Sequence, residues 1–223
     1  MTSRRARSDA AKAARRQDII DAAVSCLAER GADAVSMQDI ATSCELTKPA
    51  LYTYFPTREE LLFAVYRHLL NGWMNVFNRS LMAASSPLPR EEFNRIFVTS
   101  FAASPLLGHL TNHLFATIAP GLGGTTLEEL RTDTADQMAG LRSLLTHYEF
   151  ADARTGDAGT GDAGTGDAGT DDDLAWAYYT ILAGAAQSAD FSQAASREAD
   201  APQAITERAA FTRNCLATLN CLR

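Results

Sequence analysis

The sequence is poor in cysteine, and its cysteines form no metal-binding pattern. Of 223 residues only four are cysteine, at positions 26, 44, 215 and 221. No two of them form a CxxC pair and no histidine lies at the spacing of a zinc ligand, so we expect neither a metal site nor a disulfide framework. We interpret the thiols as reduced and buried, as in a cytoplasmic protein, and we expect no cofactor.

Long apolar runs and catalytic motifs are also missing. The longest nearly apolar stretch, residues 174–186, is too short to span a bilayer. No apolar segment follows the N-terminal arginines as it would in a secretory signal. The sequence has no paired nucleophile and base, no glycine loop for phosphate and no metal cluster, so we expect that it is not an enzyme.

An overall excess of positive charge is missing too, because the formal net charge is −7. The charge is unevenly distributed. Residues 1–17 have six basic residues and one acidic residue, a net charge of +5, whereas seven aspartates lie between positions 152 and 173. The basic arm, residues 1–12, is therefore expected to attract phosphate, and the distant acidic stretch does not oppose it.

The apolar residues that are present follow helical spacing, and no strand pattern of useful length occurs, so we expect an all-α fold. A first helix is predicted over residues 15–30, ended by Gly31. Ser36 and Asp39 predict a capping box at the start of a second helix, followed by a turn at residues 44–46. Thr47 caps a third helix that Pro56 ends, and a capping box at Thr57 begins a fourth.

Residues 36–55 have the proportions of a helix-turn-helix, in which the second helix presents a polar first turn to DNA. Leu46 and Leu51 would face the first helix of the motif. Tyr52 and Tyr54 can donate hydroxyls to phosphates or serve as core aromatics, and Arg58 is either a phosphate contact or a solvated charge. The DNA-binding candidates are Ser36, Thr47, Lys48, Pro49, Ala50, Tyr52, Thr53, Tyr54 and Arg58.

The remainder of the chain keeps a helical pattern, with breaks near residues 85–89, 104–105 and 119–124. The segment TGDAG occurs three times over residues 155–169 and predicts a disordered loop within residues 152–172, with a calcium-binding repeat as the alternative. Two last helices, 174–188 and 205–222, can pack into a four-helix bundle with a second chain, unless their own domain fills their faces. The predicted division is an arm (1–12), a DNA-binding domain (13–73) and a helical ligand-binding and dimerisation domain (74–223).

Residues 40–62, IATSCELTKPALYTYFPTREELL, resemble the signature of the TetR family of transcriptional regulators, of the TetR/AcrR helix-turn-helix type. The resemblance covers about the first third of the chain. It implies a homodimer that binds palindromic operator DNA, acts as a repressor and is released when a small-molecule inducer binds the C-terminal domain. Candidate inducer contacts are Phe77, Phe97, Phe101, His109, His113, Phe115, Trp176 and Tyr179, although core packing is an alternative for each.

Glu45 departs from this family pattern, which usually has glycine at that point of the turn. A non-glycine residue held at positive φ costs about 1 kcal/mol, and the carboxylate brings negative charge toward DNA. These features leave an alternative open, a helical small-molecule-binding protein that has lost DNA binding.

Overall fold

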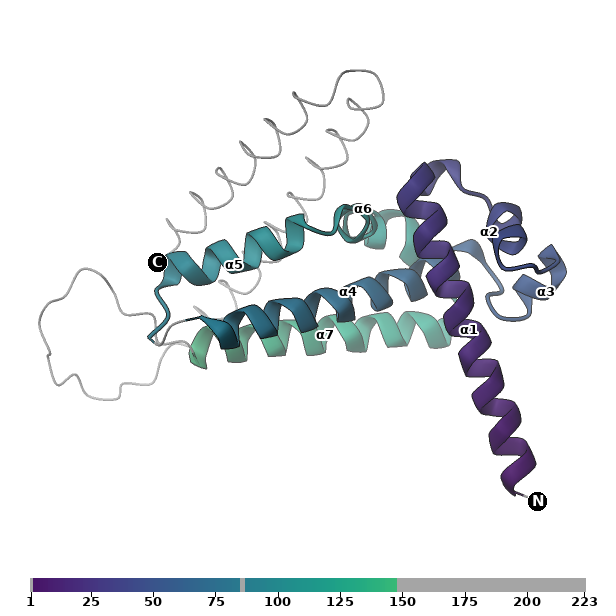
Figure 1. Cartoon of the computed structure of the whole chain (residues 1–223), viewed down its shortest axis with the longest axis horizontal. Helices are drawn as coiled ribbons and strands as arrows, with labels where there is room; N and C mark the ends of the chain where they lie inside the picture. Colours follow the sequence, from purple (N-terminus) through teal and green to yellow (C-terminus); the bar gives the residue numbers. More distant parts are fainter. Residues whose placement is uncertain (1, 85–86, 148–223) are drawn as a thin grey trace, which may run out of the picture.

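The described part of the chain is helical throughout (Figure 1). The computed structural model describes residues 2–84 and 87–147, and no strand occurs within them, so the predicted all-α class is confirmed. The α-helices are α1 (Thr2–Arg30), α2 (Met37–Ser43), α3 (Lys48–Tyr52), α4 (Arg58–Ala83), α5 (Arg90–Ala102), α6 (Pro105–His113) and α7 (Gly124–His147). Short turns of other helix types are η1 (Ala32–Ala34), η2 (Leu114–Ile118) and η3 (Ala119–Gly121).

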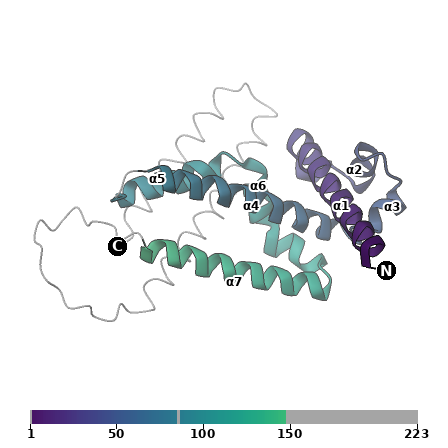
Figure 2. The same cartoon turned by 60° about the horizontal axis from the view of Figure 1, so that its bottom comes forward.

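The first three α-helices form a small unit at one end of the molecule (Figures 1 and 2). Ile19, Ala23 and Leu27 are four residues apart and are buried at 0–2% exposure, so one face of α1 contacts the interior along two turns. Helix α1 packs on α2 and α4, and α2 packs on α3. This packing fixes the position of the short α3, which is too short to be a stable helix on its own.

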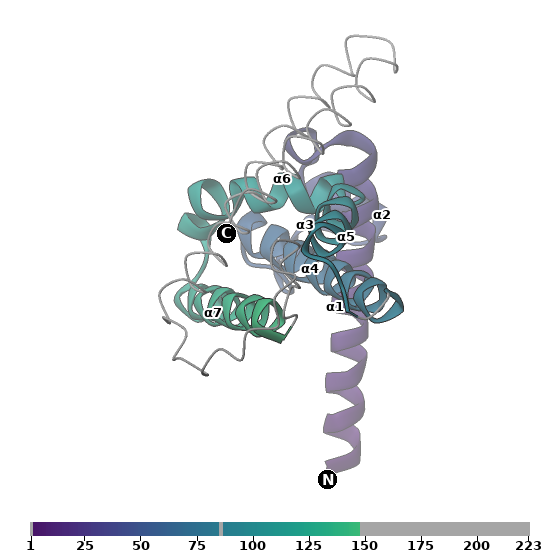
Figure 3. The same ribbon diagram turned by 90° about the vertical axis from the view of Figure 1, so that its left-hand side faces the viewer.

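Helix α1 begins earlier than the apolar pattern predicts, at Thr2 instead of residue 15. Residues 2–14 are rich in alanine and arginine and contain no glycine or proline, so their intrinsic helix propensity is high. Asp9 through Ala14 are exposed. This end of α1 projects beyond the rest of the ribbon (Figures 1 and 3).

Helix α4 joins the N-terminal unit to the body. All six residues from Leu61 to Tyr66 are buried, which means that α4 is covered on every side there. Helix α1 covers one side, and α6 and η2 cover another. The domain boundary predicted after residue 73 lies inside this helix, and it stays a prediction.

The body is built on an aromatic cluster between α4 and α5. Phe93, Phe97 and Phe101 recur every four residues and are all buried, at 0–4% exposure. Their rings meet Trp73 and Phe77 of α4, with the Trp73 and Phe97 centroids 5.6 Å apart and nearly perpendicular. Edge-to-face contacts of this kind add to the burial of the rings.

The expected breaks agree with the gap between α4 and α5, with the gap between α5 and α6 and with η3 before α7, whereas the end of α6 at His113 was not predicted. No helix among the described residues is long and apolar enough to cross a membrane. The predicted TGDAG loop, the two last helices and their dimerisation faces lie outside the described residues.

Candidate nucleic-acid interface and internal cavity

The start of α2 is fixed by the predicted capping box. The Ser36 hydroxyl accepts a hydrogen bond from the Asp39 backbone N–H at 3.3 Å, and the Asp39 carboxylate accepts one from the Ser36 backbone N–H at 2.8 Å. Hydrogen bonds from the Ser36 side chain and backbone lower the pKa of Asp39 to about 2. The box therefore satisfies two backbone donors at the entrance to the motif while Asp39 is ionised.

The turn between α2 and α3 is a Schellman motif with glutamate at the position that favours glycine. The Leu46 N–H donates to the Ala41 carbonyl at 2.8 Å, and the Glu45 N–H donates to the Thr42 carbonyl at 3.1 Å. Glu45 has a φ of 56°, and within the described residues it is the one non-glycine residue at positive φ. The turn therefore adopts its usual geometry with glutamate in the place of glycine, at the cost of local backbone strain.

Helix α3 has one exposed and one buried side. Thr47 caps it by accepting a hydrogen bond from the Ala50 N–H at 3.3 Å, and Pro49 lies in the first turn. Leu51 and Phe55 are buried at 0–1% exposure, whereas Tyr52 is 38% exposed. The exposed candidates are Ser36, Thr47, Lys48, Pro49, Tyr52 and Thr53, and the half-buried ones are Ala50, Tyr54 and Arg58.

Helix α3 is shorter than the sequence predicts, because it ends at Tyr52 and not just before Pro56. The Thr53 hydroxyl donates to the Ala50 carbonyl at 2.7 Å, a local bond that competes with continuation of the helix. Phe55 is in addition restricted to extended backbone by the proline that follows it. Helix α3 therefore has only five residues and lies at the surface of the N-terminal unit.

Four of the DNA-binding candidates surround one open groove. Ser36, Lys48, Tyr52 and Arg58 line it together with neighbouring residues of η1. The Arg58 guanidinium donates to the Ala32 carbonyl at 2.7 Å, so it bridges α4 to η1 from within the groove. Sequence reasoning missed this bond because the two residues are 26 positions apart.

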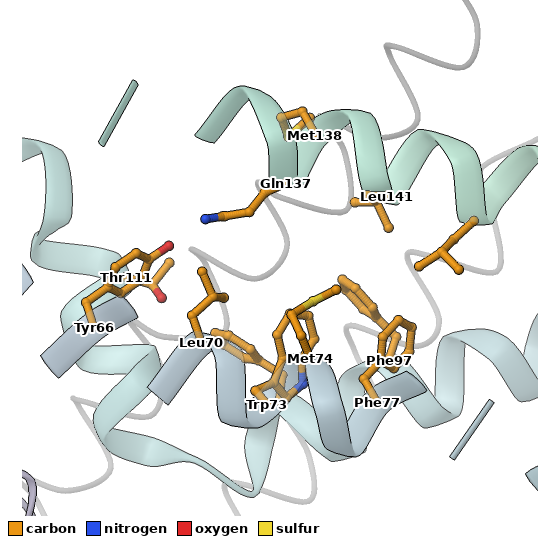
Figure 4. A pocket seen from close by; sticks show the side chains of 12 residues that line it. Tyr66, Leu70, Trp73, Met74, Phe77, Phe97, Thr111, Gln137, Met138 and Leu141 are labelled. Atoms are coloured by element: carbon orange, nitrogen blue, oxygen red, sulfur yellow. The ribbon is translucent and has the colours of Figure 1, made fainter. Parts of the chain in front are cut away.

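A cavity lies between α4, α5, α6 and α7 (Figure 4). The cavity has a volume of about 50 Å³ and is partly open to solvent. Figure 4 shows Tyr66, Thr111 and Gln137 at one end and the aromatic cluster at the other. The lining residues are Tyr66, Leu70, Trp73, Met74, Phe77, Phe97, Phe101, Thr111, Gln137, Met138, Leu141 and Leu144.

The structure brings three of the predicted inducer contacts, Phe77, Phe97 and Phe101, to this cavity. His109 and His113 lie on α6 with ring centroids 4.5 Å apart, half-buried and apart from the lining residues. Phe115 is 52% exposed. The remaining two candidates, Trp176 and Tyr179, lie outside the described residues. Within residues 2–84 and 87–147, no three His, Cys, Asp or Glu side chains lie close enough together to hold a metal ion.

Trp73 was missed as a cavity residue, although the sequence carries a signal for it. Tyr66, Leu70, Trp73 and Phe77 follow one another at intervals of four, three and four residues, which places them on one face of α4. Trp73 is not free to bind a ligand through its ring nitrogen, because the indole N–H donates to the Ser100 hydroxyl at 2.9 Å.

Contacts along α4 connect this helix to η3 and to α7. The Thr57 hydroxyl, at the N-cap of α4, donates to the Gly121 carbonyl at 3.4 Å. A Cβ at Gly121 would lie only 2.4–2.9 Å from the Glu59 side chain, so glycine is required for this close approach. Farther along, Arg67 forms ion pairs with Glu129 at 2.8 Å and Asp133 at 2.7 Å, both on α7.

Comparison with known proteins places the N-terminal unit in a family. Residues 19–65 match the family model "Bacterial regulatory proteins, tetR family". The HTH-type transcriptional repressor KstR2 of Mycolicibacterium smegmatis is 32% identical over 91 residues, which are 41% of this chain and 43% of that protein. The HTH-type transcriptional regulator BetI of Brucella anthropi is 30% identical over 90 residues, 40% of this chain and 45% of that protein. The matches thus span less than half of each curated relative.

A solved structure extends the likeness of fold to most of the chain. The structure of AibR in complex with isovaleryl coenzyme A and operator DNA aligns with a TM-score of 0.50 and 18% identity, covering 78% of this chain and 86% of that one. The capped helices, the turn at Glu45 and the match over residues 19–65 agree with one another. The helix-turn-helix unit is thus similar, over residues 19–65, to that of the tetR family of bacterial regulatory proteins.

Proposed function

We propose that the protein is a transcriptional regulator that inserts α3 into the major groove of operator DNA. The observation that carries the proposal is the exposed polar side of α3, formed by Thr47, Lys48, Tyr52 and Thr53 and supported from behind by the buried Leu51. Short polar side chains at the start of such a helix can reach base edges, and Tyr52 and Lys48 can bind phosphates. Ser36 and Arg58 lie beside them in the groove.

The protein acts as a homodimer with two copies of α3 about 34–36 Å apart, the separation of successive major grooves. The predicted helices 174–188 and 205–222 would form the dimer contact. Repression is favoured over activation because KstR2 is named a repressor. Release from DNA requires a ligand with different affinity for the DNA-bound and free arrangements.

The cavity between α4 and α7 is the proposed inducer site. None of its described lining residues is charged, so an ionised group there would lose hydration without a counter-ion. The inducer is therefore uncharged and mainly apolar, with a hydrogen-bonding group near Thr111 and Gln137. Because the enclosed space is only about 50 Å³, a larger ligand moves α7 away from α4, where Arg67 ties the two helices together.

The alternative of a small-molecule binder that has lost DNA binding is less well supported. Loss of function in the motif would first affect its turn and caps, since neither is needed by the ligand site. The Schellman turn at Glu45 and the caps at Ser36 and Thr47 are all formed, and the exposed side of α3 is unobstructed by described residues.

The test is selection of bound fragments from the organism's own DNA, followed by titration of the recovered palindrome at several salt concentrations. Replacing Lys48 by Gln is expected to weaken binding and to lower the salt slope, d log K/d log[salt], by about 0.9 per protomer. Arg79→Gln, an exposed change on α4 far from α3, is the matched control. Absence of salt-dependent binding to any recovered palindrome contradicts the proposal.

A further inference from the structure

We infer that the N-terminal half of α1 is a second DNA-binding element, which lies along the phosphate backbone beside the half-site entered by α3. Its basic stripe is formed by Arg4, Arg5 and Lys12, and the same side of the helix continues into the packed Arg15 and Arg16. The inference rests on the proposed function and deepens it, because it assigns most of the attraction to phosphate to α1 instead of α3.

The folded helix-turn-helix unit has little positive charge of its own. Residues 13–73 contain six Lys and Arg residues against eight Asp and Glu residues, a net charge of −2. Five of the six cations contact the chain itself. Arg15 and Arg58 donate to the carbonyls of Cys44 and Ala32, and Arg16 lies over the Phe55 ring. Arg30 pairs with Asp39, and Arg67 pairs with Glu129 and Asp133. Among the described contacts, Lys48 alone has no such partner.

One cation per protomer is not enough for a DNA-binding protein at physiological salt. Each neutralised phosphate adds about 0.9 to the salt slope, so that one lysine in each of two protomers accounts for a slope of only about 1.8. Lys48 is this lysine. The missing cations have to come from outside the folded unit, and residues 1–12 hold four basic residues against one acidic residue.

The helical form of α1 arranges these charges in a line. Arg5, Lys12 and Arg16 are separated by seven and four residues, and Arg4 and Arg15 by eleven. These intervals are close to whole numbers of helical turns, so the five positions share one side of the helix. Because α1 is continuous from Thr2 to Arg30, the stripe is continuous with the packed part of the helix.

The packed end of the stripe shows which way it faces. The Arg15 guanidinium donates to the Cys44 carbonyl at 2.8 Å, in the turn between α2 and α3. The Arg16 guanidinium lies 4.5 Å from the centroid of the Phe55 ring, just after α3. The side of α1 that holds the stripe is thus the side that contacts the segments just before and just after α3.

The free part of α1 is long enough to follow DNA past the half-site. Residues 2–14 of a helix rise about 20 Å, which is the length of about six base pairs. Asp9 through Ala14 are exposed, and Figures 1 and 3 show this end of α1 clear of the described helices. We expect a duplex to lie against this end of the helix.

The experiment compares full-length variants in their binding to a duplex of random sequence and to the recovered operator, by fluorescence anisotropy at several salt concentrations. Replacing Arg4, Arg5 and Lys12 together by Gln preserves helix propensity and is expected to lower the salt slope by about 2.7 per protomer. Affinity falls for both duplexes, while the ratio between operator and random DNA stays the same. The control replaces Arg79, Arg95 and Arg131 by Gln, with the same change of net charge, and leaves the slope unchanged.

A second variant, Ala10→Pro, keeps every charge but breaks the helix, since proline in a helix interior removes a hydrogen bond and clashes with the preceding turn. We expect weaker binding to both duplexes. An unchanged salt slope in the glutamine variant, or unchanged affinity in Ala10→Pro, overturns the inference. The glutamine variant is also tested on vesicles of equal parts phosphatidylserine and phosphatidylcholine. If it loses binding to the vesicles but not to the duplexes, the partner is a membrane and the inference is overturned. If the unaltered protein binds no duplex, the proposed function itself fails.

Discussion

Replacing Glu45 by Gly is expected to stabilise the protein and to strengthen its binding to DNA, for two separable reasons. At a φ of 56° an L-residue carries about 1–2 kcal/mol of steric strain that glycine lacks. Glycine also makes the unfolded chain more flexible, which offsets about 0.4–1 kcal/mol. The midpoints of these two ranges give a net gain in the free energy of unfolding of about 0.8 kcal/mol, because the turn hydrogen bonds of residues 45 and 46 are backbone bonds that glycine retains.

For a chain of 223 residues this gain corresponds to an increase in Tm of about 1–4 °C. Differential scanning calorimetry measures it, and Glu45→Gln is the matched control because glutamine keeps the strained backbone and removes the charge. We expect the Tm of Glu45→Gln to stay near that of the unaltered protein. Equal Tm values for the Gly and Gln variants would refute the reasoning from strain.

The effect on DNA binding follows the charge and not the strain. Glu45 is exposed in the turn that precedes α3, where a carboxylate repels phosphate. Both variants are therefore expected to bind random duplex more tightly at low salt, by similar factors. A gain confined to the glycine variant would mean that the turn geometry, and not the carboxylate, limits DNA affinity.

Three further predictions test the caps, the glycines and the aromatic core. The pKa of Asp39 is lowered to about 2 from 3.8, so its ionised form stabilises the fold above pH 4. This contribution disappears as the pH falls toward 2. The difference in Tm between the unaltered protein and Asp39→Asn should therefore shrink between pH 4 and pH 2. Gly121→Ala places a Cβ against a side chain of α4 and is expected to cost about 1–3 kcal/mol, whereas Gly72→Ala, with nothing within 4 Å, should stabilise by about 0.5–1 kcal/mol. Urea denaturation checks both. Phe97→Ala removes a ring that is 1% exposed and should cost about 3–5 kcal/mol, while Phe115→Ala, at a ring 52% exposed, should change stability by less than about 0.5 kcal/mol.

The sequence by itself determined the features that depend on neighbours three or four residues away. The capping box at Ser36, the cap at Thr47 and the positive φ at Glu45 are set by side chains and backbone groups within one helical turn. The all-α class follows from helical spacing in the same way. The early start of α1 escaped the prediction because an apolar period marks buried turns only, and residues 2–14 are helical through alanine and arginine propensity.

Only the tertiary structure decided which distant groups meet. The bond from Arg58 to the Ala32 carbonyl, the pairing of Arg67 with Asp133 and the close approach of Gly121 to α4 join residues 26 to 66 positions apart. Such contacts depend on how whole helices pack, and local sequence does not encode their crossing angles. For the same reason, only the packing of the helices shows that most cations of the helix-turn-helix unit contact the chain itself. The proposed role of α1 in DNA binding rests on that observation.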